Sequence, residues 1–413
     1  MTDTSVMRIV WLVNHYAASP SGTGGTRHFS LARHLADHGW YAAVIAASTE
    51  LNTNRQRLVD HESHRFESIE GVEYLWIRAP VYQGNGGGRI KNMLAFSFRL
   101  LLPGMTRNLP TPDVVVGSSV HPFAAFSGAL LASRFGVPFI FEIRDLWPQT
   151  LIDMGRIRES GLIARVLWCL EDWLCRRAAR ILTLMPCAAD YFQSRGVSRD
   201  KVVWVSNGVE VSDYPHTAHG ELTNSFTLMY FGAHGQANDL DVLIDAVDLL
   251  HSKGRLAALQ VRLVGDGPLK SKLQQRVGKS GLDSVIRFEP PVAKTEIPQL
   301  AAQADAFVIC VKDLPRLYRF GVSMNKLFDY LAAARPVIIA SNAINDPVAE
   351  AGAGLSVKAG DANALADAIN RLMRTTAEER EAMGRNGRRH VEQHYSYSTL
   401  AARFAKVLDE VVS

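Results

Sequence analysis

A chain of 413 residues is long for one domain and fits two domains of about 200 residues each. Its composition, 47% hydrophobic and 21% charged, is that of a globular protein with sizeable cores. The net charge of +4 is too mild to indicate nucleic acid binding, although it is compatible with an anionic substrate or a membrane surface.

The cysteines form no Cys-x-x-Cys pair, which argues against a zinc site and favours reduced thiols. Near the N-terminus an acidic residue, Asp3, precedes a short apolar run, Ile9–Val13, and this pattern predicts a first strand rather than a signal peptide. No apolar run is long enough to span a bilayer. We therefore expect a cytoplasmic protein that is at most peripheral at the inner face of the plasma membrane.

Met7–Val13 is predicted to be the first strand of a parallel sheet, and a loop containing Gly22, Gly24 and Gly25 follows it. The Gly-x-Gly-Gly spacing is not the dinucleotide fingerprint, and the next strand, Tyr41–Ala47, ends without an acid that could bind a ribose. The loop either lets the backbone approach a ligand closely or is simply a tight turn.

Residues 52–70 are mostly polar, and we expect this segment to lack regular secondary structure. Val72–Ile77 is predicted to be a strand. The segment 89–107 that comes after it is basic and amphipathic. It carries Arg89, Lys91, Arg99 and Arg107 among Ile90, Met93, Leu94, Phe98 and Leu102. Such a helix suits docking on anionic lipid headgroups. A packed surface helix with a solvated basic face is the alternative.

His121 and the group Glu142, Arg144 and Asp145 come just after apolar runs predicted to be strands, the second of them at Pro138–Phe141. Ligands of parallel α/β sheets bind at the carboxyl ends of the strands, so both positions are candidate functional sites. Asp145 or Glu142 could order a substrate hydroxyl. An ion-pair network without a catalytic role is the alternative for these charged side chains.

The alternation of predicted strands and helices is interrupted in the middle of the chain. Asn207-Gly208 is a turn signal, and the residues up to 224 are polar with little periodicity. The predicted boundaries are 1–206 for a first domain, 207–224 for a linker, 225–395 for a second domain and 396–413 for a final helix.

The second half begins with the strand Phe226–Phe231, and the loop after it contains Gly232 and Gly235. These glycines are predicted to leave backbone N–H groups free at the start of the next helix, an arrangement that suits a phosphate. A later strand ends in a tight turn at Gly265.

The segment from Val308 to Ala340 is predicted to be a strand, a loop, a helix capped by Ser323 and a second strand. Lys326 and Asp329 lie three residues apart in the first turns of this helix. A cation near phosphates and a carboxylate that accepts from ribose hydroxyls predict a nucleotide-diphosphate site at the loop–helix junction.

Four motifs occur in the order E-I-R-D-L-W-P, S-N-G-V, G-D-G-P and N-K-L-F-D-Y-L-A-A-A-R-P-V. Together they resemble the retaining GT-B glycosyltransferases of family 4, and most of all the subgroup that builds bacterial O-antigens, capsules and exopolysaccharides. The resemblance covers nearly the whole chain. It implies an α/β protein with two Rossmann-like, doubly wound domains facing across a cleft. The first would bind the acceptor, the second the nucleotide sugar, and the final helix would cross back to the first.

By this resemblance Asp329 would bind the ribose, Lys326 would stabilise the departing diphosphate and His121 would meet the transferred sugar. The implied catalytic residues are His121, Lys326, Asp145 and Glu142. The implied acceptor-binding residues are Arg144 and Asp145. The implied donor-binding residues are Gly24, Gly25, Gly232, Gln236, Gly265, Gly321, Val322, Ser323, Asn325, Lys326 and Asp329.

The chain departs from the family at two of these positions. Gly321 occupies the place of the first acid of the donor motif, and Gln236 occupies a place where many relatives carry lysine or arginine. The sugar hydroxyls would then be met by backbone N–H groups near Val322 and Ser323 or by Asp313.

The expected reaction is the retaining, front-face transfer of a hexosyl or N-acetylhexosaminyl group from a nucleotide-diphosphate donor, with UDP as the first expectation. The expected acceptor is a lipid-linked saccharide in bacterial surface polysaccharide (O-antigen) synthesis. We expect no metal, no other cofactor and no nucleic acid partner. A nucleotide-sugar epimerase of the same architecture and a non-catalytic nucleotide-sugar-binding subunit are the alternatives.

Overall fold

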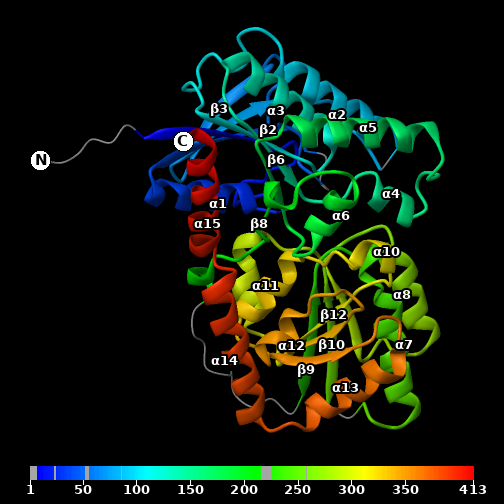
Figure 1. Cartoon of the computed structure of the whole chain (residues 1–413). Helices are drawn as coiled ribbons and strands as arrows, with labels where there is room; N and C mark the ends of the chain where they lie inside the picture. The colour runs from blue at the N-terminus through cyan, green and yellow to red at the C-terminus, as the bar shows by residue number, and fades with distance from the viewer. Residues whose placement is uncertain (1–6, 23–24, 52–54, 85, 215–224, 257) are drawn as a thin grey trace, which may run out of the picture. The chain divides into compact units, whose positions relative to one another are not determined.

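The computed structural model describes residues 7–22, 25–51, 55–84, 86–214, 225–256 and 258–413. It divides into two compact units (Figure 1), one comprising Met1–Asn207 with Tyr397–Ser413 and the other Gly208–Ser396. Of the predicted linker, residues 208–214 belong to the second unit, and residues 215–224 lie outside the described residues. No helix in the described part of the chain combines the length and the apolar character needed to cross a membrane.

The first unit contains a sheet in the order β3-β4-β2-β1-β5-β6-β7-β8. Its strands are β1 (Arg8–Val13), β2 (Trp40–Ala47), β3 (His64–Ile69), β4 (Val72–Ile77), β5 (Val114–Ser118), β6 (Phe139–Ile143), β7 (Arg180–Thr183) and β8 (Val202–Trp204). Its helices are α1 (Arg27–Leu35), α2 (Gly87–Leu100), α3 (Pro122–Phe135), α4 (Gln149–Asp153), α5 (Leu162–Arg177), α6 (Ala188–Ser194) and α15 (Tyr397–Val412).

Strand β3 was not expected, because the segment 52–70 was predicted to be irregular, and that prediction is wrong for this part of it. The strand pairs antiparallel with β4 at the edge of the sheet. Its side chains are half-buried or exposed, so neither face carries the apolar residues from which a strand is usually recognised.

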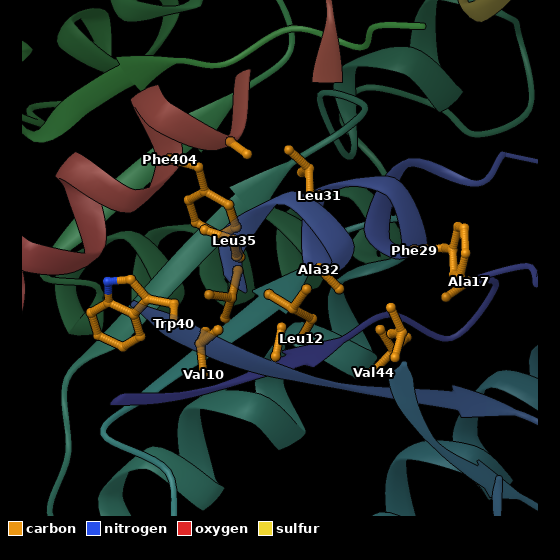
Figure 2. Close-up of a cluster of buried hydrophobic side chains, with 14 of the residues drawn as sticks. Val10, Leu12, Ala17, Phe29, Leu31, Ala32, Leu35, Trp40, Val44 and Phe404 are labelled. Atoms are coloured by element: carbon orange, nitrogen blue, oxygen red, sulfur yellow. The ribbon is translucent and has the colours of Figure 1, made fainter. Parts of the chain in front are cut away.

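The core of the first unit packs side chains from both ends of the chain (Figure 2). Contributing residues include Val10 and Leu12 of β1, Trp40 and Val44 of β2, Leu35 of α1 and Phe404 of α15. The final helix therefore belongs to the first unit, where its apolar face is buried against α1.

The second unit contains a fully parallel sheet in the order β11-β10-β9-β12-β13-β14. Its strands are β9 (Phe226–Phe231), β10 (Leu259–Val264), β11 (Ile286–Glu289), β12 (Ala306–Cys310), β13 (Val337–Ala340) and β14 (Gly354–Val357). Its helices are α7 (Leu240–Ser252), α8 (Lys270–Lys279), α9 (Ile297–Ala301), α10 (Pro315–Tyr318), α11 (Asn325–Ala332), α12 (Pro347–Ala351), α13 (Ala362–Arg374) and α14 (Ala377–His394).

Both sheets have the doubly wound, Rossmann-like order that the sequence predicts. The strand order reverses between β1 and β5 in the first unit and between β9 and β12 in the second. Ligands of such sheets bind outside the carboxyl ends of the strands at these switch points. The candidate site residues should therefore gather on the loops that follow these four strands.

Candidate active-site residues

In the second unit, the loops that follow β9 and β12 flank the switch point and are joined to each other. Lys312, just after β12, donates its backbone N–H to the carbonyl of Ala237, in the loop after β9, at 3.1 Å. Helix α11 begins nearby and brings Lys326 to the same place. The sequence therefore places a cation at the edge where a ligand of this sheet would bind.

Lys326 is held by residues of the β9 strand and loop that the sequence analysis did not single out. Its Nζ donates to the hydroxyl of Tyr230 at 3.0 Å and to Oδ1 of Asn238, and it lies 4.7 Å from the centroid of the Tyr230 ring. No carboxylate pairs with it among the described residues. Burial lowers the pKa of Lys326 to about 7. A diphosphate bound here would stabilise the ammonium form.

The prediction that Gly232 leaves its backbone N–H free is wrong. This N–H donates to the carbonyl of Val264 at 3.0 Å, and the N–H of Gly265 donates to Glu289 O at 3.2 Å. Gly265 has φ +141°, and a Cβ there would lie 2.0 Å from the carbonyl oxygen of Gly232. These glycines therefore allow two loops to pack backbone against backbone, which is a structural role.

The loop after β9 also does not lead directly into a helix. A short 3-10 turn, Gln236–Asn238, separates Gly235 from α7, which begins at Leu240. The side chain of Gln236 is exposed. The predicted helix N-terminus beside Gly235 is therefore displaced by one turn.

The segment before α11 also differs from expectation. The helix begins at Asn325, and Met324 rather than Ser323 occupies the cap position. The backbone N–H of Val322 donates to Asn345 Oδ1 at 2.8 Å, so it is not free to meet a sugar hydroxyl. Gly321 has φ +94°, a conformation that favours glycine.

Two polar groups of this region have no hydrogen-bond partner within the described residues. Asn325 Oδ1 is buried and unpaired. Asp313 is exposed and makes no polar contact there. Both could still contact a ligand, and Asp313 remains one of the two groups proposed to replace the missing acid.

Asp329 lies on the buried side of α11, where it is 5% exposed. It accepts hydrogen bonds from Lys294 Nζ at 2.6 and 2.7 Å and from the Tyr214 hydroxyl at 2.8 Å. Helix α11 thus directs Lys326 and Asp329 towards different partners. The carboxylate is already engaged by a cation and a hydroxyl, and neither partner was predicted from the sequence.

In the first unit, the switch point brings His15 and His121 together with their ring centroids 4.8 Å apart. His121 follows β5 and accepts a hydrogen bond from the Ala124 N–H through Nδ1 at 3.3 Å, while its buried Nε2 has no partner in the part of the chain that the structure describes. His15 pairs through Nε2 with Asn92 Oδ1 at 2.7 Å.

Burial lowers the pKa of His15 to about 3 and that of His121 well below its usual value, so both rings are neutral. The neutral His121 therefore carries its proton on the unpaired Nε2 and is a hydrogen-bond donor. His15 was not predicted as a site residue from the sequence. The signal was its position after β1, the neighbour of β5 in the sheet.

Glu142 is enclosed in a buried polar network, so the prediction that it orders an acceptor hydroxyl needs correction. The carboxylate is 1% exposed. One oxygen accepts from Arg27 Nε at 2.9 Å, and the other accepts from His28 Nε2 at 2.8 Å. Arg27 also donates to the carbonyls of Val205 and Ser206. The structural alternative left open by the sequence fits Glu142 better.

The other predicted residues of the first unit occupy its surface. Asp145 is exposed, and Arg144, half-buried, donates its backbone N–H to Ser119 Oγ at 3.4 Å. Both could reach a ligand. Gly25 is half-buried just before α1, and Gly24 lies outside the described residues.

Comparisons with known proteins agree with this architecture. Residues 22–208 match the model of the glycosyl transferase 4-like domain, and residues 225–375 match that of glycosyl transferases group 1. The chain is 22% identical over 302 residues to WcaI of Escherichia coli, whose name assigns it to colanic acid biosynthesis as a glycosyl transferase; the match covers 70% of this chain and 72% of WcaI.

Two solved structures share the fold. Sucrose-phosphate synthase from Thermosynechococcus elongatus has a TM-score of 0.75 at 16% identity, with 98% of each chain covered. HepE of Anabaena, solved in complex with UDP and glucose, has a TM-score of 0.67 at 16% identity, with 98% of this chain and 100% of HepE covered.

Together the two family models account for most of the chain, and each falls on one Rossmann-like unit. The motifs, the two switch points and these matches lead to one conclusion. The chain belongs to the GT-B glycosyltransferases of the family 4 type.

Proposed function

We propose that the chain is a retaining glycosyltransferase that transfers a sugar from a nucleoside diphosphate, in the first instance UDP, to a lipid-linked saccharide of a bacterial surface polysaccharide. The observation that carries the proposal is Lys326, a lysine at the switch point of the second unit that has no carboxylate partner among the described residues. The UDP and glucose in the HepE structure and the pathway named for WcaI support the choice of donor and product class.

In this proposal the diphosphate lies against Lys326, which stabilises the charge that develops on the leaving phosphate. The leaving phosphate takes the proton of the acceptor hydroxyl in a front-face reaction, so the enzyme supplies no nucleophile and needs no metal. His121 donates from Nε2 to the transferred sugar, and Arg144 and Asp145 contact the acceptor. Binding of the ribose by Asp329 requires Lys294 to release part of the carboxylate.

We also propose that α2 contacts the membrane that carries the acceptor, as the segment 89–107 suggested. Ile90, Leu94, Phe98 and Leu102 are exposed. Two of the basic residues are not on a free basic face, because Arg89 donates to the Tyr16 hydroxyl at 3.3 Å and Arg99 donates to the Arg78 carbonyl at 2.7 Å. Lys91 and Arg107 are left to meet anionic headgroups.

Donor binding should be coupled to proton uptake. With a pKa of about 7, Lys326 is mostly neutral at pH 8, and a bound diphosphate favours its ammonium form. UDP binding at pH 8 should therefore take up close to one proton, and the affinity should fall about tenfold per pH unit above 7. Isothermal titration calorimetry in two buffers of different ionisation enthalpy measures this uptake. Lys326→Arg, whose side chain stays charged, should bind UDP without taking up a proton. If proton uptake persists in this variant, another group takes up the proton.

The reaction itself is tested by product analysis. Thermal-shift measurements with nucleotide sugars identify the donor, because a ligand at about 100 times its Kd stabilises the folded state by about 2.7 kcal/mol. The selected donor is then incubated with a lipid-linked saccharide and EDTA. We expect an elongated lipid with the anomeric configuration of the donor retained. Conversion of the donor without acceptor would indicate an epimerase, and binding without any product would indicate a non-catalytic subunit.

A further inference from the structure

Helix α2 presents a row of apolar side chains to solvent. Ile90, Leu94 and Phe98 are spaced four residues apart, so they lie on one face of the helix, and Leu102 continues the row past its end. Phe98 is 68% exposed. Within the described part of the first unit, nothing covers this face.

The start of α5 exposes a second apolar group, which the sequence analysis did not single out. Leu162, Ile163 and Val166 are 77%, 62% and 56% exposed. An ordinary amphipathic helix would turn such residues towards the core, as α5 does with Leu167 and Leu174. A cluster of large apolar side chains in water indicates an interaction surface.

Helix α3 connects the two apolar groups. Its Ser127 Oγ donates to the carbonyl of Ser97 in α2 at 2.9 Å, and its Phe126 ring lies 5.1 Å from the Trp173 ring of α5. Because α3 packs against both helices, α2 and α5 lie on the same side of the sheet (Figure 1). A single flat partner could therefore meet both.

Neither apolar segment contains an acidic residue in the sequence, although the exposed Glu159 stands three residues before Leu162. The sequence contains no Asp or Glu from 74 to 112 or from 161 to 170. Lys91, Arg107 and Arg165 are exposed, and none has an acidic partner within the described residues. Exposed apolar side chains interspersed with cations suit a surface that inserts among acyl chains and pairs with anionic headgroups.

We propose that the start of α5 is a second lipid-contacting segment, which seats the first unit on an anionic bilayer together with α2. The inference deepens the proposed membrane contact of α2 and rests on it. Leu162, Ile163 and Val166 would enter the headgroup region, while Arg165 would pair with lipid phosphates. Two separate insertions would fix the orientation of the unit on the membrane, which a single helix cannot do.

Co-sedimentation with phosphatidylcholine vesicles, with and without phosphatidylglycerol, tests the proposal on the full chain. The wild type should bind the vesicles that contain phosphatidylglycerol, and less so as salt is raised. Ile163→Glu/Val166→Glu in α5 and Leu94→Glu/Phe98→Glu in α2 should each lose about tenfold or more in binding. The matched control is Ile344→Glu, since Ile344 is equally exposed, at 62%, in the second unit.

Each result decides between the proposals, provided that circular dichroism and the UDP-induced thermal shift of the variants match the wild type. If only the α2 variant loses binding, the α5 inference is wrong and the α2 contact remains. If neither loses binding, both membrane contacts are wrong. If phosphatidylcholine alone binds as well, the requirement for an anionic bilayer is wrong. If the α5 variant instead converts a dimer into a monomer in sedimentation velocity, the surface serves a second copy of the chain. The donor chemistry is tested separately by product analysis.

Discussion

Replacing Glu142 with alanine should destabilise the first unit by about 3–5 kcal/mol, because removing one partner of a buried ion pair leaves the other charge uncompensated. Both carboxylate oxygens are engaged, and Arg27, 1% exposed, would keep its charge with only backbone carbonyls to accept from it. Chemical denaturation followed by circular dichroism measures the loss as an earlier transition of the first unit, analysed separately from the second because two-domain unfolding is not two-state.

The control for this variant is Asp145→Ala. Asp145 is exposed, so its loss should change the free energy of unfolding by no more than about 0.5 kcal/mol. The destabilisation caused by Glu142→Gln should lie between those of Glu142→Ala and Asp145→Ala, since glutamine keeps the shape of the side chain but not its charge. If the Glu142→Ala protein unfolds like the wild type and yet lacks transferase activity, Glu142 has a catalytic role. That result would contradict the structural role assigned to it.

The same network predicts the direction of the acid response. Burial alone would raise the pKa of Glu142, but the electrostatic interactions and hydrogen bond with His28, together with the charge of Arg27, outweigh it and hold the pKa well below its usual value. A carboxylate with a depressed folded pKa contributes stability above its unfolded pKa and loses it as the pH falls through the folded pKa. This contribution should therefore persist in mild acid.

The sequence predicted those parts of the fold that depend on local pattern. Buried parallel strands are rich in apolar residues, so β4 and β9 were predicted with the bounds that the structure has. The same pattern predicted that Lys326, at the start of the helix that follows β12 and its loop, lies near the ligand-binding edge of the sheet. Ligands of parallel sheets bind outside the carboxyl ends of the strands. Strand β3 was missed because an edge strand with half-buried faces lacks that pattern.

The partners of the site residues were not predictable in the same way. Lys294 and Asp329 are 35 residues apart in sequence, and Arg27 and Glu142 are 115 apart. Such pairs are set by how the strands are ordered in the sheet, which a single sequence leaves open. The backbone N–H groups of Gly232 and Val322 were expected to be free because both residues lie in glycine-containing loops. In the structure, residues that are distant in sequence accept from them: Val264 from Gly232, and Asn345 from Val322.

Lys326→Ala should lower kcat about a hundredfold, which corresponds to a loss of about 3 kcal/mol of transition-state stabilisation. Lys326 is the residue that the proposed mechanism places against the leaving diphosphate, and no carboxylate within the described residues neutralises it beforehand. Because negative charge grows on that phosphate as the glycosidic bond breaks, the loss should fall on kcat more than on the KM for the donor. Initial rates with saturating acceptor measure both quantities.

Lys312→Ala is the matched control for this experiment. Lys312 lies on the loop after β12, beside the same switch point, but its link to Ala237 uses the backbone N–H, which alanine keeps. The kcat of Lys312→Ala should therefore stay close to the wild-type value. Lys326→Arg should recover part of the kcat lost in Lys326→Ala, since it restores the positive charge without the geometry of the ammonium group. If Lys326→Ala turned over like the wild type, the diphosphate would have to be stabilised elsewhere. Lys326 would then be no guide to the donor site.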